Sequence, residues 1–204
     1  CGLLRLPSGP TVLFDTGTQS GYDVARNTLL PFLSARKLPT PRIAFVSHAN
    51  TDHYNGLIEL ARRGMLRRVY LNAHFGEGSQ FAGDRDARQF VELLRAHDIE
   101  IIRLGAGEVV DLDADTRVTV LWPSDTVTTS TEPNSRSLVL RVDTLGRSVL
   151  LPGDAQASVL EQLLAQPGAI NADVLLLPHH GAWMGELPAF VETVNPQVVL
   201  QSTG

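Results

Sequence analysis

The chain has 204 residues, 43% of them hydrophobic, with 17 Lys and Arg against 22 Asp and Glu. The apolar fraction excludes a disordered chain, and the length predicts one globular domain or two small ones. A net charge of -5 argues against a protein that grips nucleic acid over its whole surface, although a local site could still do so. No stretch approaches 18 consecutive apolar residues, so we expect this segment to be soluble and to make no membrane contact itself.

The single cysteine, Cys1, stands at the start of the chain. One cysteine cannot form an internal disulfide, so stability has to come from the core, and the redox compartment stays open. A chain that begins at Cys is either a fragment or a processed protein, for example one lipidated at that residue. We favour the fragment, because Leu3, Leu4 and Leu6 have the pattern of a strand rather than of a tether.

The predicted elements begin with a β-hairpin over residues 2–6 and 11–14, joined by a Pro-Ser-Gly-Pro turn. Hydrophobic periodicity then predicts alternating helices and strands in the first half. These elements are a helix over 24–33, a strand over 43–46, a helix over 56–63, a strand over 68–72, an amphipathic helix over 86–97 and a strand over 100–104.

The second half begins with short β-rich runs that predict a mostly antiparallel meander. The runs cover 109–112, 117–122, 137–142 and 148–151. They are followed by a helix over 157–165, a strand over 174–177, a helix over 189–194 and a strand over 198–201. Strands with helices between and after them predict an α/β architecture in which helices sandwich the sheets. We see no linker or short repeat.

Polar clusters directly follow four of the predicted apolar strands. Asp15, residues 48–53, Asp154 and the pair His179 and His180 all occupy this position. Loops at strand ends are where a rigid scaffold brings side chains from distant parts of a chain together. The sequence therefore predicts one shared site.

The loop after the strand over 43–46 carries the side chains that borderline divalent metals prefer. His48, Asn50, Asp52 and His53 lie within six residues. Strand-like alternation predicts that residues 48, 50 and 52 point to one side and that His53 points to another, so the loop could serve two neighbouring metals. The competing interpretation is a polar loop with chance histidines.

Asp154 is the natural bridging ligand, because one carboxylate can hold a pair of cations about 3.5 to 4 Å apart. Its competing role is an N-cap of the helix over 157–165. Either His179 or His180 could enter the site, and the sequence leaves open which one is the ligand. Asp15 either forms a turn or accepts a hydrogen bond from a ligating histidine.

These motifs make the chain similar to the metallo-β-lactamase fold, and most of all to the C-terminal hydrolase-like domain of ComEC-type competence proteins. The resemblance covers nearly the whole chain, as a single domain over 1–204. It rests on residues 14–17, 48–56, 134–140, 151–154 and 178–181. It implies a four-layer αββα sandwich with a metal site at the strand-end loops. The family's pattern also continues beyond both ends of the chain, which supports the fragment interpretation.

The chain departs from the superfamily pattern at two positions that usually hold histidine. Asn50 stands at one, and Asn134 lies nearest the other. The resemblance implies a first site of His48, Asn50, Asn134 and half of Asp154, and a second of Asp52, His53, Asp154 and His179 or His180. Amide oxygens are poor zinc ligands but suit harder ions. We expect one or two divalent metals, Zn or Mn, bound tightly at the second site, with Mn²⁺ or Mg²⁺ held weakly at the first if it fills.

The expected chemistry is hydrolysis, in which the metal lowers the pKa of a bound water towards about 7. Asp52, His53 and Asp154 are the expected catalytic residues, with Asp52 orienting the hydroxide. Oxygen-rich ligation and two cations favour attack on a phosphodiester over β-lactam or thioester cleavage. The resemblance implies a nuclease that degrades DNA during uptake, in a bacterial inner-membrane protein. The membrane face, the physiological substrate and the oligomeric state stay open.

Two alternatives compete with the nuclease. One is a hydrolase of small esters or lactones, which suits the acidic net charge, and the other is a degenerate binding module without catalysis. Arg62, Arg63, Arg67 and Arg68 could contact phosphates, but a solvated face is the favoured interpretation of such a run.

Overall fold

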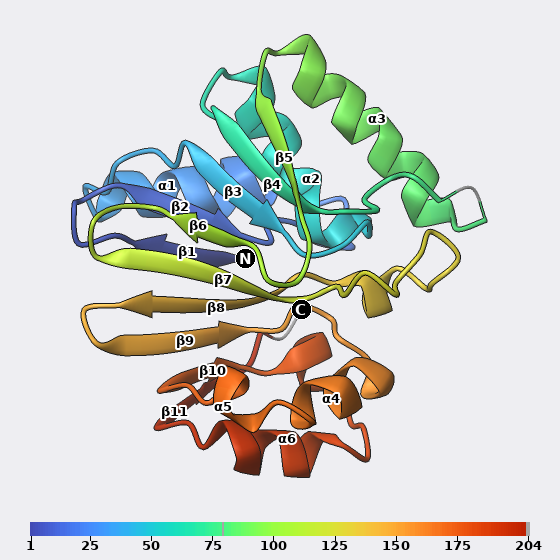
Figure 1. Ribbon diagram of the computed structural model, residues 1–204. Helices are drawn as coiled ribbons and strands as arrows, with labels where there is room; N and C mark the ends of the chain where they lie inside the picture. The colour runs from blue at the N-terminus through green and yellow to red at the C-terminus, as the bar shows by residue number, and fades with distance from the viewer. Residues whose placement is uncertain (79, 203–204) are drawn as a thin grey trace.

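The computed structural model describes residues 1–78 and 80–202. Two β-sheets lie face to face, and helices cover the outer face of each (Figure 1). The strand order is β1-β2-β3-β4-β5 in the first sheet and β11-β10-β9-β8-β7-β6 in the second. The first half of the chain builds one sheet with its helices, and the second half builds the other.

The first sheet is parallel except at β1, which pairs antiparallel with β2. Its strands are β1 (Gly2–Arg5), β2 (Thr11–Phe14), β3 (Ile43–Val46), β4 (Arg68–Asn72) and β5 (Glu100–Leu104). Its helices are the π-helical turn η1 (Ala25–Leu29), α1 (Leu30–Ala35), α2 (Thr51–Arg62) and α3 (Ala82–Ala96).

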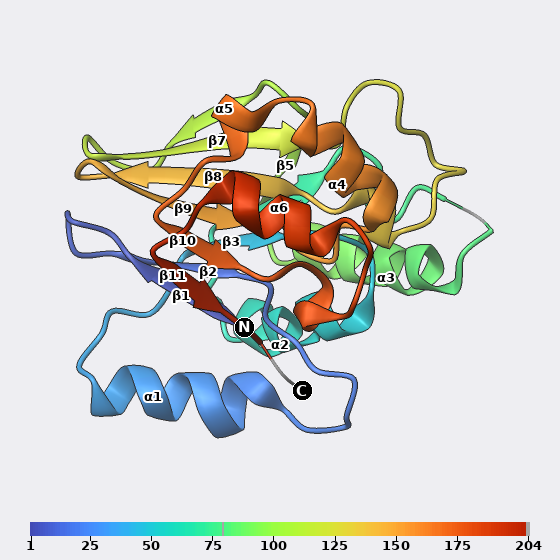
Figure 2. The ribbon, with the colours of Figure 1, turned by 90° about the horizontal axis from the view of Figure 1, so that it is seen from below.

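The second sheet is an antiparallel meander from β6 to β9 that continues in parallel through β10 and β11. Its strands are β6 (Val109–Asp111), β7 (Thr116–Trp122), β8 (Val139–Thr144), β9 (Arg147–Leu151), β10 (Val174–Leu176) and β11 (Val198–Leu200). Its helices are α4 (Ala157–Leu164), α5 (Pro167–Ile170) and α6 (Leu187–Val194), with short 3₁₀ turns η2 (Asn134–Arg136) and η3 (Pro178–Gly181). Figure 2 shows α4, α5 and α6 lying over this sheet.

Three separate apolar clusters hold the layers together. Leu57 and Leu60 of α2 pack with strand residues on the outer face of the first sheet. Phe45 and Tyr70 belong to the cluster between the two sheets, where their rings stack with centroids 4.4 Å apart. A third cluster, with Phe190 of α6, covers the outer face of the second sheet. Three cores between four layers confirm the predicted αββα sandwich.

Some predicted boundaries were wrong. Helix α2 begins at Thr51, five residues before the predicted start, and α3 begins at Ala82 instead of residue 86. The first turn of α2 carries polar residues, and its buried apolar side chains begin only at Tyr54, so periodicity could not reveal the start. The four-residue helix α5 was missed because it is too short for a periodic pattern.

The sheets direct the ends of several strands to one edge of the sandwich. Asp15 follows β2, and its backbone N–H donates to the carbonyl of Phe45 in β3. Across the sheets, the N–H of Leu138 donates to the carbonyl of Ser47, over 2.8 Å. Within residues 1–78 and 80–202, no helix has the length and apolar character needed to cross a bilayer.

Candidate metal centre

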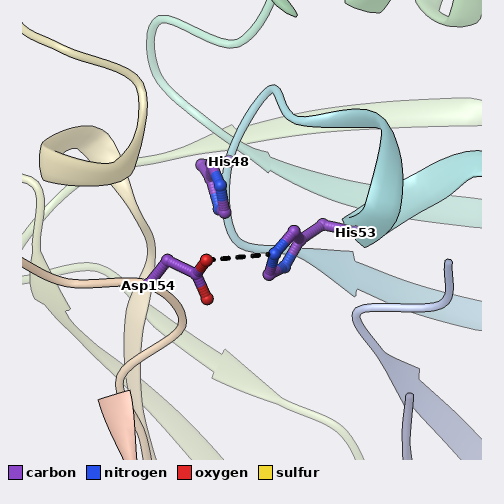
Figure 3. A group of neighbouring side chains, drawn as sticks. All are labelled: His48, His53 and Asp154. Atoms are coloured by element: carbon purple, nitrogen blue, oxygen red, sulfur yellow. Dashed lines mark ion pairs between the residues drawn. The ribbon is translucent and has the colours of Figure 1, made fainter. Parts of the chain in front are cut away.

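Ligand-type side chains from both halves of the chain meet at this edge. His48, His53 and Asp154 each offer a donor atom, and these atoms lie within 4.8 Å of one another (Figure 3). Asp52, His53 and His180 form a second group by the same criterion. His53 belongs to both groups, and its Nε2 lies 3.3 Å from Oδ2 of Asp154. The carboxylate of Asp154 is therefore within reach of the side chains of residues 48–53.

His48 follows β3 and is completely buried. Its Nδ1 lies 3.0 Å from Oγ of Ser47, and that hydroxyl donates its own hydrogen to Asp15. Nδ1 of His48 must therefore carry the hydrogen, which leaves a lone pair on Nε2, a buried atom without a hydrogen-bond partner. Burial and the neighbouring His53 lower the pKa of His48 to about 3, so the ring is neutral. A neutral imidazole with an unpartnered nitrogen can bind a metal.

His53 lies in the first turn of α2 and is oriented by Asp15. Its Nδ1 is 3.0 Å from Oδ2 of Asp15, which leaves Nε2 facing Asp154 and Asp52. Burial lowers the pKa of His53, but the carboxylates of Asp15 and Asp154 outweigh burial and raise that pKa to about 10. The site thus favours positive charge beside Nε2, as expected of a pocket that takes a cation. Of the two roles expected of Asp15, this contact agrees with that of an acceptor for a histidine hydrogen bond.

Asp154 follows β9 and Gly153, whose φ is +56°. A Cβ on Gly153 would lie 2.7 Å from Cβ of Ser47, so only glycine lets the two sheets approach this closely. Burial raises the pKa of Asp154, but the contact with His53 prevails and lowers that pKa to about 2. The competing N-cap role is wrong, because the residue that precedes α4 is Gln156.

The two histidines after β10 differ in what surrounds them. Nε2 of His180 lies 3.7 Å from Oδ2 of Asp154, and its Nδ1 lies 3.1 Å from the carbonyl of Ser202. His179 instead places Nδ1 3.2 Å from the amide nitrogen of Gln156, so this ring nitrogen is an acceptor. Nδ1 of His180 therefore faces a carbonyl and its Nε2 faces the donor groups, whereas Nδ1 of His179 faces Gln156.

The predicted alternation of side-chain directions along residues 48–53 was wrong. Because α2 begins at Thr51, Asp52 and His53 share a helical turn, and Oδ2 of Asp52 lies 3.6 Å from Nε2 of His53. The amide nitrogen of Asn50 donates to Oδ1 of Asn134 over 2.9 Å. The two amides expected at the first site thus bind each other.

The spacing of the donor atoms fits a four-coordinate ion. Bonds of about 2.0 to 2.1 Å in a tetrahedron place neighbouring donors about 3.4 Å apart. From Nε2 of His53, Asp154 lies at 3.3 Å and Asp52 at 3.6 Å, and Asp154 lies 3.7 Å from His180. Nε2 of His48, which has no hydrogen-bond partner, adds a further donor, and this donor set fits a divalent metal.

All 204 residues match the family model of the metallo-beta-lactamase superfamily. The chain belongs to this superfamily. Its members share this αββα fold, and the chain is accordingly a metal-dependent hydrolase by class.

The metallo-β-lactamase chain is similar to two proteins of bacterial competence and recombination. It is 24% identical over 205 residues to ComE operon protein 3 of Bacillus subtilis, covering 95% of this chain and 25% of that protein. It is 28% identical over 203 residues to Recombination protein 2 of Haemophilus influenzae, covering 98% of this chain and 22% of that protein. The chain thus spans about a quarter of the length of these relatives.

A solved structure shows the same fold with a metal. Zn²⁺-bound PqqB from Methylobacterium extorquens superposes with a TM-score of 0.55 at 17% sequence identity, covering 85% of this chain and 57% of that one. At this identity the likeness concerns the fold alone. Superfamily members bind divalent metals, often zinc.

Sequence reasoning missed Ser47 and Gln19 of this metallo-β-lactamase chain. Ser47 bonds to Asp15 and lies beside both buried histidines, and the amide of Gln19 donates to Asp52 over 3.3 Å. A small hydroxyl residue at the end of a buried strand, directly before a histidine, is the signal that could have revealed Ser47. Gln19 lies in an exposed loop with no sequence signal.

The arginine run does not lie at the metal centre. Arg68 pairs with Ile43 at the start of β3, whereas His48 follows its end, roughly 16 Å away at 3.3 Å per residue. Arg63 binds Glu59, and Arg68 binds Glu100. The solvated-face interpretation is the one that agrees with the structure.

Proposed function

We propose that this chain is a metal-dependent phosphodiesterase of nuclease type, in a ComEC-like protein that internalises DNA. The convergence of Asp52, His53, Asp154 and His180 carries the proposal. Two carboxylates with imidazoles suit hard or borderline cations, which favour phosphoryl oxygen as a substrate atom. The name of one relative refers to recombination, which is a reaction of DNA.

The proposed tight site consists of Asp52, His53, His180 and Asp154, and the proposed weak site adds His48 beside Asp154. The neighbouring pair Asn50 and Asn134 completes the weak site. Zn or Mn is the proposed metal, with Mg possible at the weak site. When bound, such a metal would activate water for attack and stabilise the negative charge on the oxygens of the attacked phosphodiester.

The chain's own residues have separate tasks in this proposal. Asp15 accepts the hydrogen on Nδ1 of His53, which orients Nε2 towards the other donor groups. The carbonyl of Ser202 does the same for His180. Asp52 is the proposed acceptor that orients the attacking water, and Gln19 fixes its carboxylate.

Metal analysis and two small substrates test the proposal. Purified chain should hold about one metal per molecule and hydrolyse bis(p-nitrophenyl) phosphate faster than p-nitrophenyl acetate. Asp154→Asn should lose both metal and turnover, whereas the control Asp143→Asn, in β8 away from the site, should retain them. Faster cleavage of the ester would contradict the nuclease and favour a hydrolase of small esters. A purified chain without metal would contradict both enzymes and favour a binding module without catalysis.

A further inference from the structure

Trp183 is the most exposed of the large hydrophobic side chains in the described part of the chain. Its exposed fraction is 79%, although tryptophan is usually well buried. It lies between η3 and α6, three residues after His180. The next residue, Met184, is buried in the core under α6, so the loop is anchored beside the exposed indole. An anchored loop therefore presents an aromatic side chain to solvent three residues from a proposed ligand.

A second exposed aromatic lies in the loop between β2 and η1. Tyr22 is 50% exposed, and its hydroxyl is 3.1 Å from Oγ1 of Thr28. The same loop includes Gln19, which donates to Asp52. Loops from both halves of the fold thus carry an exposed aromatic within three residues of a side chain that contacts the donor groups.

The distribution of charge favours aromatic side chains over basic ones as the main contacts of a nucleic acid at the edge that carries the donor groups. The net charge is -5, and the densest arginine run lies at the opposite end of the first sheet. Contacts between arginine or lysine and phosphate therefore cannot dominate at this edge. Stacking of bases on aromatic rings is the remaining general contact, and it requires bases that are not already stacked in a duplex.

We propose that Trp183 stacks on an unpaired nucleobase next to the scissile phosphodiester and thereby selects single-stranded over duplex nucleic acid. This inference rests on the proposed nuclease function. Trp183 is then a specificity-determining residue, and Tyr22 is a secondary support for the same strand.

Binding measurements test the stacking without relying on turnover. The probe is a phosphorothioate thymidine oligonucleotide, which resists hydrolysis, added to the protein as purified. It should quench the emission of Trp183, while Trp122, bonded to the carbonyl of Ser135, gives a constant background. Trp183→Phe should abolish the quenching yet keep the affinity within about three-fold, and Trp183→Ala should weaken binding about ten-fold.

The control is Leu145→Ala, which removes another exposed apolar side chain. Leu145 is 70% exposed in the turn between β8 and β9, at the end of the second sheet opposite the site, so this variant should bind like the parent. Affinity should also fall only weakly with salt, because few phosphates are neutralised. Unchanged affinity in Trp183→Ala, or equal affinity for a duplex of the same sequence, would overturn the inference.

Hydrolysis of bis(p-nitrophenyl) phosphate by the parent chain separates this inference from the function on which it rests. If the parent cleaves this diester but Trp183→Ala binds the oligonucleotide normally, the stacking proposal fails and the phosphodiesterase stands. If the parent binds and quenches but cleaves no phosphodiester, the nuclease function fails and Trp183 remains a base-binding residue.

Discussion

Ser47 and Asp15 belong to neither donor group, yet they determine which ring nitrogen each buried histidine presents. Asp15 accepts hydrogen bonds from the backbone N–H and the hydroxyl of Ser47, and it also contacts Nδ1 of His53. Ser47 in turn accepts from His48. The two small side chains therefore aim both Nε2 atoms at the same place before any ion arrives.

At the residue scale, Asp15→Asn should weaken metal binding by about 10 to 100-fold, because the amide cannot hold the imidazole as a carboxylate does. Competition with a chromogenic chelator measures the affinity. Asp23→Asn is the matched control, since Asp23 pairs with the exposed Arg26. An affinity equal to that of the parent would show that Asp15 only shapes the turn.

At the scale of elements, the approach of β9 to β3 depends on a glycine. Gly153→Ala should destabilise the fold by about 2 kcal/mol, because a positive φ and contact with Ser47 both oppose the added methyl. Gly146→Ala is the control, since Gly146 has φ of +73° but no atom within 4 Å of an added Cβ. Urea unfolding should show the larger loss for Gly153, and equal losses would mean that close packing is irrelevant there.

A buried ion pair joins the elements of the two halves beside the metal centre. Arg136 in η2 contacts Asp84 in α3, with side chains 1% and 0% exposed, and also donates to the carbonyl of His74. The loop before β8 accordingly approaches the amino-terminal end of α3 (Figure 1). This pair fixes the turn that carries Asn134.

Removal of one partner of this pair should leave a buried charge without compensation. Arg136→Met should therefore lower the free energy of unfolding by about 3 to 5 kcal/mol. Arg117→Met, which breaks a solvent-exposed pair with Asp111, should change the free energy of unfolding far less. Similar losses for the two variants in urea titrations would contradict the structural role assigned to Arg136.

The sequence predicted the strands and the clustering of polar residues better than it predicted the exact geometry. His48, His53 and Asp154 were foreseeable because each follows a strongly apolar strand. The distinction between His179 and His180 was not foreseeable, because it depends on backbone with φ of 47° and 58° and on partners distant in sequence. The start of α2 was hidden because its first turn is polar.

At the scale of the whole molecule, the donor set spans both halves of the sandwich. Asp52 and His53 belong to the first half, whereas Asp154 and His180 belong to the second. An ion bound by all four would link the two sheets at one edge. Because such a site exists only in the folded state, binding should stabilise the fold as a whole.

Removal of metal by a chelator should therefore lower the Tm of the parent chain by about 10 °C, given about 4 kcal/mol of binding at a thousand-fold excess over Kd. Differential scanning calorimetry measures the shift. Asp154→Asn should show almost no change with chelator, since it retains little metal. A parent Tm that does not respond to chelator would contradict a link between the halves.

Anomalous X-ray diffraction from crystals grown with Zn²⁺ or Mn²⁺ tests the central claim most directly. We predict a strong peak within bonding distance of Nε2 of His53 and His180 and of the carboxylates of Asp52 and Asp154. A peak coordinated by His179, or no peak among these four side chains at saturating metal, would contradict the account.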